Sequence, residues 1–288
     1  MAGTSDRFLP AKAPAPPSSV QIPSAHDTGL ALEGGVETAL GGVFFLINLM
    51  CALDLPAAFE ADWHLAGGLG AWGVLDAIGR SLLASRADAV EDPIWVALAQ
   101  LSGRRLIPRL APGANYRLPD TWLAHAPADG HAAAAWGARR GWLRVWSKAD
   151  YVLSETRLGA VAPATAAWRE ARHYGSVTTP ARAAFSAAPI TSLAGPLVAG
   201  LDRNLKRWLA LAVPFIRLRL ARALGITSDD ESLGRALLAR RGRLFVAPTH
   251  VDLVMGLDSV ALPVRLAGLD RSPGWLGVFG RVILFHFE

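Results

Sequence analysis

The chain has 288 residues, of which 52% are hydrophobic and 18% are charged, and it carries a formal net charge of +5 at pH 7. This composition excludes a wholly disordered chain, which would need low hydrophobicity, and the length is enough to bury a sizeable core. The single cysteine, Cys51, cannot form an internal bridge, so a disulfide-dense scaffold is excluded as well.

Residues 1–28 are rich in proline, alanine and serine and have no hydrophobic period. Proline fixes φ and lacks a backbone donor, so this stretch is typical of a disordered tail, or else of a tether or docking arm. We expect the disordered tail. The first residues, Met1 to Arg7, are polar, and no apolar segment follows a cationic stretch as in a secretory signal. Together with the single cysteine, this predicts a cytoplasmic protein.

Residues 29–105 are predicted to form a small helical bundle. A first helix is expected over Val36–Leu53 and a second over about Trp72–Ser85, where large apolar residues recur at helical spacing. A third follows Asp92, a good N-cap residue, and stops at Gly103, which suits a left-handed helix end. Three apolar faces of this kind can bury one another.

The most hydrophobic segment of the chain, residues 38–53, lies between two acidic residues and contains two glycines and an asparagine. A membrane-spanning helix needs about 20 mostly apolar residues, so this segment is short for a span. We therefore expect a buried core helix, and insertion of residues 38–53 into a membrane is the alternative.

Residues 106–196 are predicted to be an irregular connector, because prolines interrupt any long element. A β-hairpin is expected at about 141–155. There, Trp142–Trp146 alternates apolar and polar residues, Ser147–Asp150 supplies a turn, and Tyr151–Leu153 returns.

Residues 197–288 are predicted to combine helices with strands. Apolar residues three and four apart indicate a long helix over Leu197–Leu224, kinked at Pro214 because proline removes a backbone donor. Four segments are typical of strands: Leu244–Ala247, Thr249–Met255, Pro263–Ala267 and Arg281–Phe287. The sequence thus predicts an α+β fold with a helical N-terminal half, a hairpin in the middle, a long kinked helix and a small antiparallel β-rich C-terminal end.

The best candidates for chemistry are His250 and Asp252. Residues i and i+2 of a strand point to the same face, so this imidazole and carboxylate could share a metal ion or a proton. His286, on another predicted strand, could join them. A His-x-Asp triplet also occurs on solvated strand faces, and that is what we expect here.

Other catalytic and cofactor motifs are missing from the sequence. There is no Gly-x-Ser-x-Gly nucleophile elbow, and the glycine pairs lack both the dinucleotide fingerprint and the lysine of a P-loop. Cys51 lies in an apolar run, where burial blunts a thiol. We therefore predict no catalytic, cofactor-binding or metal-binding residues. No block of lysines and arginines is present, so nucleic acid is not expected as a partner.

The chain has ten tryptophans, a residue type enriched at protein interfaces. Those on apolar faces of predicted helices are expected in the core. Trp142, Trp146 and Trp275 lie in predicted hairpins or loops, so both core packing and an interface remain open for them.

Two parts of the chain resemble a known family. One part is Gly41–Leu49, with the sequence GGVFFLINL, followed by Asp92–Trp95. The other is Val264–Trp275, with the sequence VRLAGLDRSPGW, followed by Gly280–Val282 and Phe285–Phe287. Together they resemble accessory proteins encoded with bacterial contractile injection systems, the phage-tail-like particles. The resemblance implies a structural or assembly role near a tube-and-sheath particle, and it implies no catalytic residues.

We therefore expect a non-enzymatic structural, assembly or adaptor component whose partners are other proteins of such a particle. Two alternatives remain. One is a metal-dependent hydrolase that uses His250, Asp252 and His286. The other is a membrane-associated protein that inserts residues 38–53.

Overall fold

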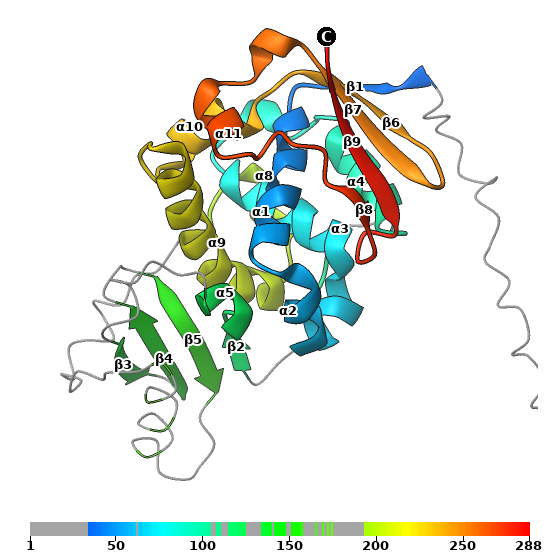
Figure 1. Cartoon of the computed structure of the whole chain (residues 1–288). Helices are drawn as coiled ribbons and strands as arrows, with labels where there is room; N and C mark the ends of the chain where they lie inside the picture. Colours follow the sequence, from blue (N-terminus) through cyan, green and yellow to red (C-terminus); the bar gives the residue numbers. More distant parts are fainter. Residues whose placement is uncertain are drawn as a thin grey trace, which may run out of the picture. The chain divides into compact units, whose positions relative to one another are not determined.

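The structure is a computed structural model of the whole chain (Figure 1). The predicted tail over residues 1–28 lies outside the residues that it describes. Those residues are 34–61, 63–104, 108–110, 115–124, 134–139, 141–147, 151–157, 165, 169, 172, 174 and 193–288.

The N-terminal half is mainly helical, as expected. A 3-10 helix at Gly41–Phe45 leads into the α-helices, which are α1 (Leu46–Ala52), α2 (Leu55–Ala61), α3 (Trp63–Leu82) and α4 (Ile94–Leu101). Gly70, with φ of +62°, interrupts α3. The third helix agrees with its prediction, because the Asp92 carboxylate accepts a hydrogen bond from the Ile94 amide at 2.9 Å and Gly103 has φ of +66°.

The expected helix over Val36–Leu53 is wrong at its beginning. Val36–Thr38 forms strand β1, and helical structure starts at Gly41. Asp92 stabilises this arrangement, since its carboxylate accepts hydrogen bonds from the Thr38 hydroxyl at 2.5 Å and from the Ala39 amide at 2.8 Å. The side chains of the apolar segment that follows, Val43–Met50, are almost all buried in the core.

The long helix expected over Leu197–Leu224 is divided into α8 (Pro196–Ala199) and α9 (Arg203–Leu224). The division lies at Asp202, whose carboxylate accepts hydrogen bonds from the Asn204 and Leu205 amides at 2.8 and 3.0 Å and so begins a new helix. Helix α9 continues through Pro214, the expected kink position. A short helix, α10 (Asp230–Leu233), and a π-helical turn at Gly234–Leu238 follow.

The C-terminal strands belong to a five-stranded sheet of order β1-β6-β7-β9-β8. Its further members are β6 (Gly242–Val246), β7 (His250–Met255), β8 (Gly274–Leu276) and β9 (Arg281–Phe287). The expected antiparallel arrangement is wrong in one pairing, because β7 and β9 are parallel. The segment Pro263–Ala267 is not a strand: helix α11 (Leu262–Leu266) occupies it. A parallel pair needs a crossover connection, and proline fits the first turn of a helix.

The hairpin expected at about 141–155 is present as β4 (Trp142–Ser147) paired with β5 (Val152–Arg157). It is part of a larger antiparallel sheet of order β2-β5-β4-β3, with β2 at Asn115–Arg117 and β3 at Ala134–Arg139. A short helix, α5 (Asp120–Ala124), accompanies it. The segment 106–196 therefore contains more regular structure than the irregular connector with a hairpin that we expected.

The fold is α+β. Figure 1 shows helices α1, α3 and α4 beside one face of the five-stranded sheet. That face contributes Val251, Leu253 and Ile283 to one continuous hydrophobic core, in which all three are fully buried. The four-stranded sheet contacts α9 through β2 and β5. The other face of the five-stranded sheet carries the candidate site.

Candidate functional site on the outer sheet face

The five-stranded sheet has one buried face and one face whose side chains are exposed or half-buried, because successive residues of a strand point to opposite sides. On β7 the buried residues are Val251, Leu253 and Met255. We call the opposite side the outer sheet face. It consists of Arg243, Phe245, His250, Asp252, Val254, Trp275, Val282, Leu284 and His286.

The strand register orders these residues in rows across the sheet. One row joins Trp275, Val282 and His250 on β8, β9 and β7. The next row joins Leu284 on β9, Asp252 on β7 and Phe245 on β6. Polar groups thus lie among half-buried apolar residues, a mixture that differs from a purely solvated sheet face.

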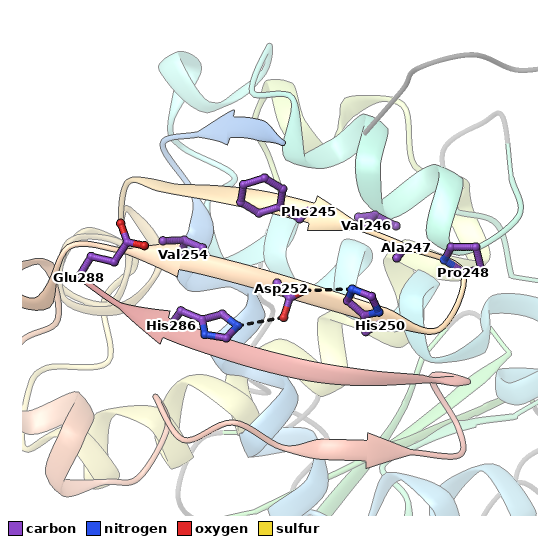
Figure 2. Close-up of a pocket in the computed structure, with 9 residues that line it drawn as sticks. All are labelled: Phe245, Val246, Ala247, Pro248, His250, Asp252, Val254, His286 and Glu288. Carbon is purple, nitrogen blue, oxygen red and sulfur yellow. Dashed lines mark hydrogen bonds and ion pairs between the residues drawn. The ribbon is translucent and has the colours of Figure 1, made fainter. Parts of the chain in front are cut away.

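The structure brings His250, Asp252 and His286 together, as the spacing of the first two suggested (Figure 2). The Nε2 atom of His286 lies 2.9 Å from Oδ1 of Asp252, and Nε2 of His250 lies 3.3 Å from Oδ2. Each carboxylate oxygen therefore faces one imidazole. The other ring nitrogen of His250, Nδ1, lies 3.1 Å from the Thr249 hydroxyl.

These groups line an open pocket of about 650 Å³. The residues that line it are Phe245, Val246, Ala247, Pro248, His250, Asp252, Val254, His286 and Glu288 (Figure 2). Glu288 is held at the end of β7 by backbone hydrogen bonds, since its amide donates to the Met255 carbonyl at 3.0 Å and its carbonyl accepts from the Leu257 amide at 2.8 Å. The lining therefore combines apolar side chains with two imidazoles and two carboxylates.

Within the part of the chain that the structure describes, no group of three or more His, Cys, Asp and Glu side chains is placed to hold a metal ion. In Figure 2 the two imidazoles face different oxygens of Asp252.

The hydroxyl, imidazole and carboxylate of Thr249, His250 and Asp252 form a chain through which a proton can pass. The two imidazole side chains are 46% and 49% exposed, however. Water therefore reaches both rings in the structure. These groups present hydrogen-bonding atoms to a molecule that enters the pocket.

Sequence reasoning left the role of Trp275 open and did not identify Phe245 or Glu288. Trp275 is 64% exposed on β8, whereas Trp146 is buried and Trp142 is half-buried under the Arg207 guanidinium, which lies 3.7 Å from its ring. A surface tryptophan in a Gly-Trp-Leu strand gives no signal of its orientation in the sequence alone.

Side-chain hydrogen bonds hold the segment before Trp275 against helix α1 and strand β9. The Asn48 amide of α1 donates hydrogen bonds to the carbonyls of Leu269 and Arg271, both at 2.7 Å. The Ser272 hydroxyl accepts a hydrogen bond from the Phe285 amide at 2.8 Å. These contacts hold residues 269–272, which lead into β8, and so help to position the backbone of Trp275.

A second group of exposed apolar side chains lies outside this face. Leu262 and Leu266, one helical turn apart on α11, are 66% and 77% exposed. Leu257, in the turn after β7, is 57% exposed. Its carbonyl accepts a hydrogen bond from the Arg265 guanidinium at 2.6 Å, which ties this turn to α11.

Comparison with known proteins adds no relative: no family model, no curated protein and no solved structure matches the chain. A search of the described helices for a membrane span found none with the necessary length and apolarity.

Proposed function

We propose that this protein is a non-enzymatic assembly or adaptor component of a contractile injection particle, and that it binds another protein of the particle through the outer sheet face. The proposed link to a contractile injection particle is supported by the resemblance of the segments around Gly41–Leu49 and Val264–Trp275 to proteins encoded with such particles. The exposed side chain of Trp275 supports the outer sheet face as the binding surface. The proposal places the protein in the bacterial cytoplasm.

The single observation that carries the binding role is that the side chain of Trp275 is 64% exposed. The segment that leads into its strand is held by hydrogen bonds from Asn48 and to Ser272. A large aromatic side chain costs little conformational entropy when it is immobilised, and tryptophan dominates the energy of many protein interfaces. Val282, opposite Trp275 on β9, and Leu284, two residues further along β9, are half-buried, and a partner would cover them. A rigid aromatic anchor with an apolar surround is the pattern of an interaction surface.

The test is co-purification of the tagged full chain with sheath and tube proteins from cells that express the particle genes. Truncation of an interface anchor costs about 2 kcal/mol or more, which corresponds to roughly thirtyfold in affinity. Trp275→Ala should therefore lose the partner. Val96→Ala is the matched control, because Val96 is 50% exposed on α4, and this variant should retain the partner.

Two outcomes contradict the proposal. If Leu262→Ala with Leu266→Ala abolishes co-purification while Trp275→Ala does not, the interface is the α11 surface. If particles assemble and fire normally in cells that lack this chain, the assembly role itself is wrong.

A further inference from the structure

The pocket on the outer sheet face differs in charge from the rest of the protein. The chain has 29 lysines and arginines against 24 acidic residues, yet the charged residues that line the pocket are Asp252 and Glu288. Two arginines lie close by and are already engaged. Arg243 pairs with Glu37 at 2.9 Å, and the Arg281 guanidinium donates to the Ala247 carbonyl. The lining of the pocket thus contains two carboxylates and neither lysine nor arginine, which favours a cationic ligand.

The free acceptor positions of the Asp252 carboxylate indicate which type of cation would bind best. A carboxylate has about four acceptor positions. Each oxygen of Asp252 uses one of them for an imidazole, at 2.9 Å for His286 and 3.3 Å for His250. One position on each oxygen remains, and the Asp252 side chain is 20% exposed toward the pocket. A guanidinium donates two parallel hydrogen bonds, one to each oxygen of a carboxylate, whereas an ammonium is a point charge.

The apolar side of the pocket suits the remainder of an arginine side chain. The Phe245 ring is part of the pocket lining and can contact a planar guanidinium. Val254 lies beside Phe245 and can cover the methylene stem. Glu288 supplies a second carboxylate at the rim.

We propose that this pocket binds the guanidinium of an arginine side chain presented by the partner protein, with Asp252 as the bidentate acceptor. The inference rests on the proposed function, because it names the chemistry that the partner brings to the outer sheet face. The two imidazoles act as positioning groups, since they hold the carboxylate in one orientation.

The experiment titrates the full chain with N-acetyl-arginine methylamide and follows the ring carbon–proton NMR signals of His250 and His286. The uncharged isostere, N-acetyl-citrulline methylamide, and the lysine derivative are the comparison probes. We expect a saturable shift of both histidine signals in the millimolar range with the arginine probe, a weaker response with lysine and none with citrulline. Equal responses to arginine and citrulline would overturn the proposal.

Variants make the assignment specific. Asp252→Asn should abolish the saturable response, and Glu288→Gln should weaken binding several-fold. Asp258→Asn is the matched control, because Asp258 is exposed outside the pocket, and it should bind the probe like the unmodified chain. Full binding by both Asp252→Asn and Glu288→Gln would show that the pocket does not recognise the cation.

The two proposals fail separately. If Trp275→Ala loses the partner but the arginine probe does not bind, the outer sheet face is retained as the interface and the proposal of an arginine-binding pocket is wrong. If the probe binds and Trp275→Ala retains the partner, the pocket stands and the proposed interface is wrong.

Discussion

Asp76, within helix α3, shows how a single buried charge affects the whole protein. Its side chain is 3% exposed and pairs with Arg80 at 2.5 Å, and the Arg80 guanidinium lies 4.5 Å from the centre of the Trp95 ring. Burial raises the pKa of the Asp76 carboxyl, and the nearby Arg80 opposes this without cancelling it. Asp76 therefore retains its proton more readily in the folded protein than in the unfolded chain.

The direction of this pKa shift predicts a pH dependence of stability. A group whose pKa is raised by folding stabilises the protein below its unfolded pKa, and this contribution is lost as the pH rises through the folded pKa. The free energy of unfolding of the unmodified chain, measured in urea relative to Asp76→Asn, should therefore decrease from pH 4 toward pH 7.

Asp88→Asn is the control for that measurement. A hydrogen bond from Arg86 lowers the pKa of the exposed Asp88, so its contribution has the opposite sign and is lost as the pH falls. The same trend for both variants would contradict the role of burial at Asp76.

The candidate site shows which features can be foreseen at the scale of residues. His250 and Asp252 share a face because the period of a strand is two, and this follows directly from their spacing. The position of His286 depends on the parallel register of β7 and β9, which pairs Val254 with His286. That register joins strands separated in the chain by α11 and β8, and no local pattern in the sequence specifies it.

At the scale of elements, the 3-10 helix at Gly41–Phe45 packs unusually close to the π-helical turn at Gly234–Leu238. The Gly41 amide donates a hydrogen bond to the Arg240 carbonyl at 2.7 Å. A Cβ atom at Gly42 would lie only 1.8 Å from the Leu237 carbonyl oxygen, which is a backbone atom that cannot move aside alone. Glycine at this position is therefore a packing requirement.

This contact predicts the effect of adding one methyl group. Gly42→Ala should lower the free energy of unfolding by about 1–3 kcal/mol, the usual cost of overpacking, or more if the backbone cannot adjust. Gly277→Ala is the matched control. No atom lies within 4 Å of the Cβ position there, so its effect should stay within about 0.5 kcal/mol. Urea unfolding of both variants checks the prediction, and equal stability of the two would contradict it.

Elements with strong local signals were predicted correctly, and those decided by distant partners were not. The cap at Asp92 and the alternation of Arg281–Phe287 are local, and both elements occur where expected. Val36–Thr38 is a strand because β6 pairs with it, and β3 has an alanine- and glycine-rich sequence with little strand propensity. Their structure is a product of tertiary pairing.

At the scale of the whole molecule, a buried charge cluster connects the four-stranded sheet to helix α9. Glu155 on β5 is 6% exposed and accepts a hydrogen bond from Arg144 on β4 at 2.6 Å. Its second oxygen lies 3.7 Å from Nε of Arg207 on α9. Arg207 in turn covers the Trp142 ring, so one carboxylate links two strands and the helix behind them.

Loss of this link should weaken one part of the protein more than the rest. Removal of one partner from a buried ion pair costs about 3–5 kcal/mol, so Glu155→Ala should destabilise the chain by about that amount. Amide hydrogen exchange should show the greatest loss of protection in β4 and β5.

Glu37→Ala is the control, because the Glu37–Arg243 pair is exposed and such pairs contribute less than about 1 kcal/mol. Equal loss of protection in the four-stranded and five-stranded sheets would show that Glu155 does not hold the smaller sheet in particular.

The pairing of β1 with β6 has a consequence for biosynthesis. Val36–Thr38 pairs with residues between Gly242 and Leu244, so the first strand of the sheet is translated long before its neighbour exists. At about 5–20 residues per second, a ribosome needs on the order of 10–40 s to add the intervening segment. Throughout that interval the nascent chain can assemble its helices, but the sheet that carries the proposed binding surface cannot close. The proposed recognition of a partner therefore has to wait until β9 has been translated.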